Sequence, residues 1–150
     1  MRGPVGAKVV AWEITTTGIT ETAPGRGCAV GDFNNDGTLD VVVNCVNDVP
    51  QLLRCELSSG NHWIQIKCAV KSNRSGIGAR VYCITEKHRQ MDEVRSGGSY
   101  ISQNDLRIHF GLGAADRAGI EVHWPSGIVD RLPGLTANRI YTVVEGKGLP

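Results

Sequence analysis

The fold is decided by HWIQIKCAVK, the stretch from His62 to Lys71. Apolar side chains recur at every second position of this stretch, as Ile64 and Ile66 show, and polar side chains such as Gln65 and Lys67 lie between them. Neighbouring side chains of a β-strand point to opposite faces of the sheet, so this alternation is typical of a strand with one buried face.

The same period of two recurs along the rest of the second part of the chain. Glycine and proline pairs such as Gly97-Gly98 and Pro133-Gly134 separate the runs, and no window of helical length keeps a 3.6-residue period without a glycine. About seven short strands at this spacing predict an all-β fold, an antiparallel β-sandwich over residues 61–150. The further candidate strands are Ala79–Glu86, Arg89–Arg95, Leu106–Leu112, Ile120–Trp124, Ile128–Leu132 and Ile140–Val144.

Residues 1–60 have a different pattern and are expected to form a smaller separate domain, with the boundary in the loop near Ser58–Asn61. Three strands are too few to be stable alone, so we expect them to pack on the second part or on another chain. The predicted strands are Gly27–Phe33, Asp40–Val46 and Gln51–Leu57, and Lys8–Thr17 is a further candidate.

The connection between the first two of these strands, Asp32–Asp40, reads DFNNDGTLD. Oxygen-bearing side chains recur at positions 1, 3, 5 and 9, and Gly37 occupies position 6, where a chain curling around an ion turns sharply. Calcium prefers such hard oxygen ligands. The pattern therefore predicts a calcium-binding (Ca2+) loop whose ligands are Asp32, Asn34, Asp36, Thr38 (through its backbone carbonyl) and Asp40.

This loop has two other interpretations, an EF-hand and a polar hairpin turn. An EF-hand needs a glutamate at position 12 and flanking helices, but position 12 is Val43 and the flanks are strand-like, so the EF-hand is excluded. A polar hairpin turn would explain Asn35, Asp36 and Gly37 by turn geometry alone. It would not explain the carboxylates at the two ends of the loop, which repel one another without a cation.

Composition excludes several classes of protein. A formal net charge of +1 argues against a dedicated nucleic-acid binder. No stretch is long and apolar enough to span a membrane, so membrane insertion is not expected. The first residues, MRGPVG, lack the apolar core of a secretory signal peptide. The five cysteines contain no C-x-x-C pair; one disulfide between Cys28 and Cys45 stays open as an alternative to free thiols.

Several motifs resemble a known pairing of families. The segment from Gly27 to Asp40 resembles one FG-GAP/VCBS repeat, the blade unit of integrin-like β-propellers. Motifs further along the chain, in the right order, resemble the ASPIC/UnbV domain. These motifs are Asn61–Trp63, Ser75–Arg80, Ser99–Gln103, His109–Gly113 and Trp124–Gly127.

The resemblance implies a secreted or cell-surface protein with calcium in the propeller repeats and a role in adhesion or matrix recognition. It implies no catalytic activity. One incomplete repeat cannot close a propeller ring, so two alternatives stay open. Either the chain is a truncated or mobilised gene fragment, or the hairpins are reused, for example in a dimer interface.

Three further residues are weaker candidates for ligand binding. If Leu112 lies opposite Ile120, His109 would lie opposite His123, and the pair could hold Zn²⁺ or Cu²⁺. An ordinary exposed cross-strand pair is favoured over the metal site, because further ligands are missing. Trp63 is expected on the exposed face, where it could stack on a sugar ring, but a core or interface role is favoured over sugar binding.

No nucleophile elbow, His-Glu-x-x-His motif or paired-cysteine zinc site is present in the sequence, which argues against an enzyme. The predicted function is that of a non-catalytic, calcium-binding recognition or adhesion module with a protein or glycan partner. The alternative is a metal-independent structural or assembly protein that forms a homodimer through the unpaired strand edge of residues 1–60.

Overall fold

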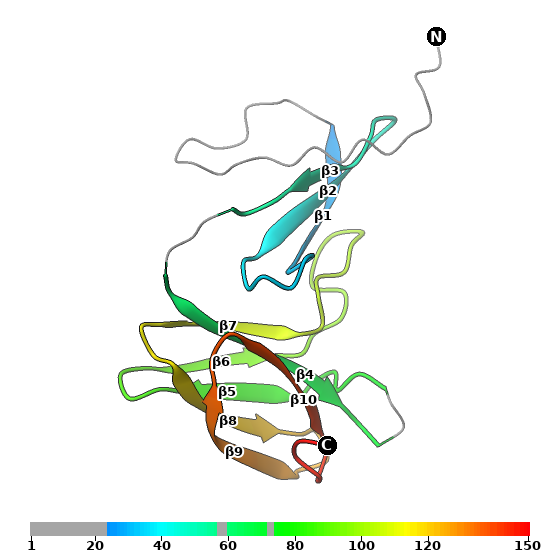
Figure 1. The fold of residues 1–150 in the computed structure, drawn as a ribbon. Helices are drawn as coiled ribbons and strands as arrows, with labels where there is room; N and C mark the ends of the chain where they lie inside the picture. The colour runs from blue at the N-terminus through cyan, green and yellow to red at the C-terminus, as the bar shows by residue number, and fades with distance from the viewer. Residues whose placement is uncertain (1–23, 57–59, 72–73) are drawn as a thin grey trace. The chain divides into compact units, whose positions relative to one another are not determined.

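The computed structural model describes residues 24–56, 60–71 and 74–150 and contains ten β-strands and no helix in these ranges (Figure 1). The chain divides into two compact units. One contains residues 24–56 together with Gly97–Asp105, and the other contains residues 60–96 and Leu106–Pro150 apart from the two residues not described. The candidate strand Lys8–Thr17 lies outside the described residues.

The first unit is built on a three-stranded antiparallel sheet in the order β1-β2-β3. Its strands are β1 (Gly25–Gly31), β2 (Asp40–Cys45) and β3 (Gln51–Leu53). These are the three strands expected from the sequence, each somewhat shorter or shifted at its ends. The pair Gly31↔Asp40 ends the hairpin of β1 and β2, so the loop DFNNDGTLD leaves and re-enters the sheet at one point.

The second unit is a β-sandwich of seven strands, as expected. One sheet has the order β10-β4-β7 and the other the order β6-β5-β8-β9 (Figure 1). The bounds are β4 (His62–Ala69), β5 (Arg80–Ile84), β6 (Arg89–Glu93), β7 (Ile108–Gly113), β8 (Arg117–His123), β9 (Val129–Thr136) and β10 (Arg139–Val144).

One pair of strands departs from the expected antiparallel order: β10 runs parallel to β4. The connection between β9 and β10 passes through Asn138, whose φ of 58° is in the left-handed region, and takes the chain from one sheet to the other. A strand that changes sheets does not form a hairpin with its predecessor, so its direction relative to its new neighbour is free to be parallel.

The core of the second unit lies between its two sheets. The alternating residues Ile64, Ile66 and Cys68 are buried there together with Phe110 and Trp124, which confirms the periodicity of the sequence. The complete cluster is Ile64, Ile66, Cys68, Ala79, Val81, Cys83, Val94, Ile108, Phe110, Leu112, Ala118, Ile120, Val122, Trp124, Ala137 and Val143.

The glycine of the Ser75–Arg80 motif has a packing role. A Cβ atom on Gly76 would lie 2.6 Å from the ring of Trp124 and 2.9 Å from the Cβ of Cys68. Only glycine lets this turn close over the tryptophan, whose indole nitrogen donates to Asp130 Oδ2 at 2.7 Å. The motif therefore serves the core of the sandwich.

All five cysteines are free. The strand register places Cys28 opposite Val43 and Cys45 opposite Gly25, so the two thiols that could have formed a hairpin disulfide are not cross-strand partners. In the sandwich core, burial raises the pKa of Cys68 to about 12 and that of Cys83 to about 11. These two thiols pack as small apolar side chains.

Candidate metal centre

The loop between β1 and β2 is folded by its own carboxylates. Asp32 is buried, with 3% of its surface exposed. Its Oδ1 accepts from the amide of Asp36 at 3.1 Å and its Oδ2 from the amide of Gly37 at 2.9 Å. The φ of 91° at Gly37 lies in the left-handed region, which is why a glycine is needed at the sixth position of this turn.

The carboxylate at the other end of the loop joins three segments. Asp40 is 2% exposed, and its Oδ2 accepts from the amide of Phe33 at 3.1 Å. Its Oδ1 accepts from the amide of Cys55, after β3, at 2.9 Å. The hydroxyl of Thr38 lies 2.9 Å from the carbonyl of Cys55 and shares its one proton between this carbonyl and Asp36 Oδ1, so the loop has two contacts with Cys55.

Asp36, in the middle of the loop, is turned toward its neighbours. Its Oδ1 accepts from the amide and the hydroxyl of Thr38 at 2.8 and 2.6 Å, and its Oδ2 accepts from Asn34 Nδ2 at 2.5 Å. Arg54 approaches Oδ2 at 3.9 Å. Desolvation raises the pKa of Asp36, but these hydrogen bonds and the Arg54 charge outweigh it and lower the pKa below its usual value. The carboxylate is therefore charged at neutral pH.

The side chains of the loop offer oxygen atoms, which are the type of ligand that a hard cation prefers. The loop supplies side-chain oxygens from Asp32, Asn34, Asp36 and Asp40, and two of the carboxylates are buried and fixed by backbone amides. A carboxylate oxygen that accepts one hydrogen bond keeps a second lone-pair direction for a cation. Across the part of the chain that the structure describes, however, no three His, Cys, Asp or Glu side chains are gathered as a metal-holding group. To join the two buried carboxylates, Asp36 would exchange its bonds to Asn34 and Thr38 for the cation.

A segment distant in sequence completes the edge of this sheet. The hydroxyls of Ser99 and Ser102 both donate to the carbonyl of Cys28 at 2.7 Å. Val30 is bonded twice, its amide to Asn104 Oδ1 at 3.0 Å and its carbonyl to the amide of Asp105 at 2.9 Å. The outer edge of β1, expected to be unpaired, is thus covered by the segment Gly97–Asp105 of the same unit. Sequence reasoning noted the motif Ser99–Gln103 but missed this role.

The predicted opposition of His109 and His123 is wrong. His109 lies on β7, which pairs with β4, whereas His123 lies on β8, in the other sheet. The connection after Gly113, whose φ is 60°, crosses between the sheets instead of forming a hairpin. His109 stacks on Trp63 with ring centroids 6.2 Å apart, and Trp63 is half-buried and not openly exposed.

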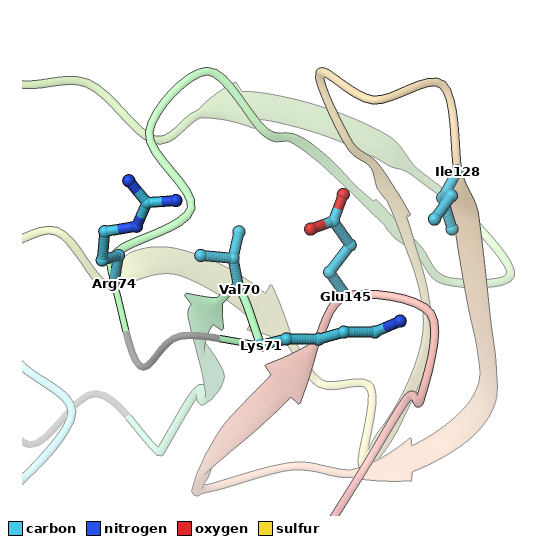
Figure 2. Close-up of a pocket in the computed structure, with 5 residues that line it drawn as sticks. All are labelled: Val70, Lys71, Arg74, Ile128 and Glu145. Carbon is cyan, nitrogen blue, oxygen red and sulfur yellow. The ribbon is translucent and has the colours of Figure 1, made fainter.

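Two cavities lie in the sandwich unit. The smaller, of about 370 Å³, is shown in Figure 2, where Val70, Lys71 and Arg74 of the β4–β5 connection lie around Ile128 and Glu145. The larger, of about 830 Å³, lies at the β5–β6 turn and the β7–β8 connection. Lys87, His88 and Arg117 contribute to its lining, next to glycines and alanines.

Comparisons with known proteins find a family model and relatives that each match more than half of the chain. A family model described as "ASPIC and UnbV" matches residues 69–150. Cartilage acidic protein 1 of Xenopus tropicalis is 32% identical over 107 residues, and its mouse counterpart is 31% identical over the same length. The match covers 69% of this chain, but the chain spans only 16–17% of the length of these relatives.

A search of solved structures finds a candidate cell adhesion protein from Bacteroides ovatus, at 12% identity and a TM-score of 0.38, with 91% of this chain and 62% of that chain covered. Among the described residues, no helix is long and apolar enough to cross a membrane.

Proposed function

Because the chain belongs to the ASPIC and UnbV family, which is not a known enzyme family, we propose that it is a non-catalytic recognition module of the adhesion type. In this proposal the first unit is a partial FG-GAP/VCBS repeat whose loop Asp32–Asp40 binds calcium. The module acts at the cell surface or outside the cell, in keeping with the family resemblance, and its partner is a protein or a glycan.

One observation carries the calcium part of the proposal. Asp32 and Asp40 are the two buried charged side chains among the described residues of the first unit, and both accept from backbone amides of one loop. Burying two carboxylates costs free energy, which hydrogen bonds from backbone amides and an opposite charge can each offset. A calcium ion held between them and Asp36 supplies that charge, and its effect would be to stabilise the β1–β2 hairpin and its bonds to Cys55.

The test is a comparison of thermal unfolding in excess calcium and in chelator. Calcium at about 100 times its dissociation constant should add roughly 2.7 kcal/mol to the free energy of unfolding of the wild-type chain. The variant Asp36→Ala should lose most of this stabilisation. Asp48→Ala, which removes an exposed carboxylate whose Oδ1 accepts from the next amide, is the matched control and should keep it. A wild-type melting temperature that does not respond to calcium would contradict the proposal.

A second candidate function, self-assembly without a metal, is favoured by the surface of the same sheet. β3 forms its other edge, and Val42 in the central strand is 42% exposed. An edge strand and an exposed apolar residue both invite pairing with another chain. Light scattering over a range of concentrations separates the two candidates, because a monomer at high concentration in chelator would remove the assembly role.

A further inference from the structure

The outer face of the four-stranded sheet β6-β5-β8-β9 carries a cluster of arginines around one aromatic ring. The inward residues Val81 and Ile120 are buried, so alternation places their strand neighbours Arg80, Tyr82 and Glu121 on the opposite face. The same registers add Arg89, Met91, Glu93, His123 and Arg131 to this face, which we call the arginine face.

The centre of the arginine face already holds a carboxylate. Arg131 Nε donates to Glu121 Oε1 at 3.2 Å, and Arg89 and His123 approach Glu121 Oε2 at 3.8 and 3.5 Å. Desolvation raises the pKa of Glu121, but the neighbouring His123 ring and the hydrogen bond and charge of Arg131 outweigh it and lower the pKa below its usual value. The geometry shows that two guanidinium groups from different strands can converge on one carboxyl group.

The arginines keep donors for a further ligand. Their side chains are 62% (Arg80), 61% (Arg89) and 67% (Arg131) exposed although each makes an ion pair. A guanidinium has five N–H donors, and these pairs use only part of them. Exposed ion pairs contribute about 0–1 kcal/mol to stability, so stability alone does not account for three arginines here.

The centre of the arginine face also contains apolar groups, the ring of Tyr82 and the side chain of Met91. Arg89 lies over the ring of Tyr82, 4.5 Å from its centroid, and His123 lies against the same ring at 4.8 Å. Met91, opposite Tyr82 across the strand pair, is 53% exposed. Arginine, tyrosine and methionine are enriched at protein interfaces, where the stacked guanidinium is held in a fixed orientation for a carboxylate.

We propose that the arginine face binds an acidic peptide segment of a partner protein, whose carboxylates pair with Arg80, Arg89 and Arg131 while an apolar side chain packs on Tyr82 and Met91. Charge complementarity supports this partner, because the three arginines face two carboxylates, Glu93 and Glu121. The mixture of charged and apolar groups suits a peptide better than a uniformly charged polymer. This inference rests on the recognition role proposed above but does not need calcium.

The test measures fluorescence anisotropy of two labelled peptides, one of alternating Glu and Leu and one of alternating Gln and Leu, added to the whole chain in chelator and in calcium. We expect binding of the acidic peptide that weakens with salt, in both buffers. Arg80→Gln combined with Arg131→Gln should weaken binding about tenfold. The matched control is Arg139→Gln with Lys147→Gln, which removes the same charge from exposed sites of β10 and the C-terminal turn.

Glu121→Gln gives a second readout of opposite sign. It frees Arg89 and Arg131 from their internal partner, so affinity for the acidic peptide should rise several-fold. Equal losses in the face and control variants, no binding of the acidic peptide by folded wild type, or tighter binding of a sulfated oligosaccharide than of the peptide would each overturn the proposal. If peptide binding persists while calcium fails to stabilise the chain, only the calcium proposal falls.

Discussion

The two units of the chain bury different kinds of side chain. In the sandwich unit the buried core is a single apolar cluster between two sheets. In the first unit the described buried side chains are three apolar ones, Cys45, Leu52 and Leu53, and two carboxylates, Asp32 and Asp40. Apolar burial is non-directional and depends on area, whereas the carboxylates act through particular amides.

Because of this difference, we expect the stability of the two units to respond differently to pH and to ions. The sandwich unit should tolerate changes of pH and ions, because its buried core cluster is apolar. The first unit is small, and the carboxylates of Asp36 and Asp40 hold its loop through hydrogen bonds. Carboxylate oxygens are also ligands that suit a hard cation. We therefore expect pH and ions to change the stability of the first unit more than that of the sandwich unit.

The largest expected effect is in the sandwich core. Ile66→Ala removes a side chain that is 0% exposed in the central strand β4, and the loss of buried area with the cavity left behind should cost about 2–5 kcal/mol of unfolding free energy. Urea unfolding followed by tryptophan fluorescence measures it. Ile77→Ala, at a site that is 47% exposed, is the control and should cost about 0.5 kcal/mol. Similar costs at both sites would break the contrast between apolar core and surface.

A smaller and more local effect is expected in the first unit. Asp40→Ala leaves the amides of Phe33 and Cys55 without their acceptor, which should cost on the order of 1–3 kcal/mol for each group that stays away from water. Hydrogen exchange should show faster opening of β1 and β2 with little change in β4 and β8. Asp48→Ala should leave both sets of amides unchanged. A loss of protection that spreads equally into the sandwich would show that the two units unfold together.

The strands of both units could be predicted because each depends on a local pattern. The alternation in His62–Lys71 and the turn residues of the loop Asp32–Asp40 predicted the sandwich strands and the hairpin. The positions of the apolar side chains determine which face is buried, and the two interior faces of the sandwich follow from that.

Two features of the structure could not be predicted from the sequence. One is where the chain crosses from one sheet to the other, and the other is the set of hydrogen bonds between residues far apart in sequence. The crossing after Gly113 separates His109 from His123, and no periodicity in the sequence reports it. The bonds from Ser99 and Ser102 to Cys28 span more than seventy residues and involve a backbone carbonyl, which any residue type provides. Asn34 and Thr38, which donate to the carboxylate of Asp36, are its near neighbours in sequence. The sequence does not show whether these donors or a cation would bind its oxygens.

The smallest expected effect is on acid stability, and it concerns Asp36. Its pKa is lowered in the folded chain, so its contribution to stability is fully present above the unfolded value near 3.8 and is lost as the pH falls through the folded pKa. Melting in chelator from about pH 6 to about pH 2.5 should show a decline below the unfolded pKa that is shallower in Asp36→Asn. The amide oxygen of the variant still accepts from Thr38 and does not titrate, whereas its NH2 group cannot accept from Asn34, so the variant keeps the Thr38 bonds and loses one hydrogen bond.

The acid profile also tests whether the first unit is the sensitive one. Because Asp36 is partly exposed and its partners are near the surface, the change should appear in hydrogen exchange of the β1–β2 amides before it appears in β4. Asp48→Asn removes a carboxylate from another exposed turn of the same unit and should follow the wild-type curve. If Asp36→Asn also follows the wild-type curve, the hydrogen bonds from Thr38 and Asn34 do not stabilise the charged form, and the carboxylate of Asp36 is held no more firmly than that of a solvated surface aspartate.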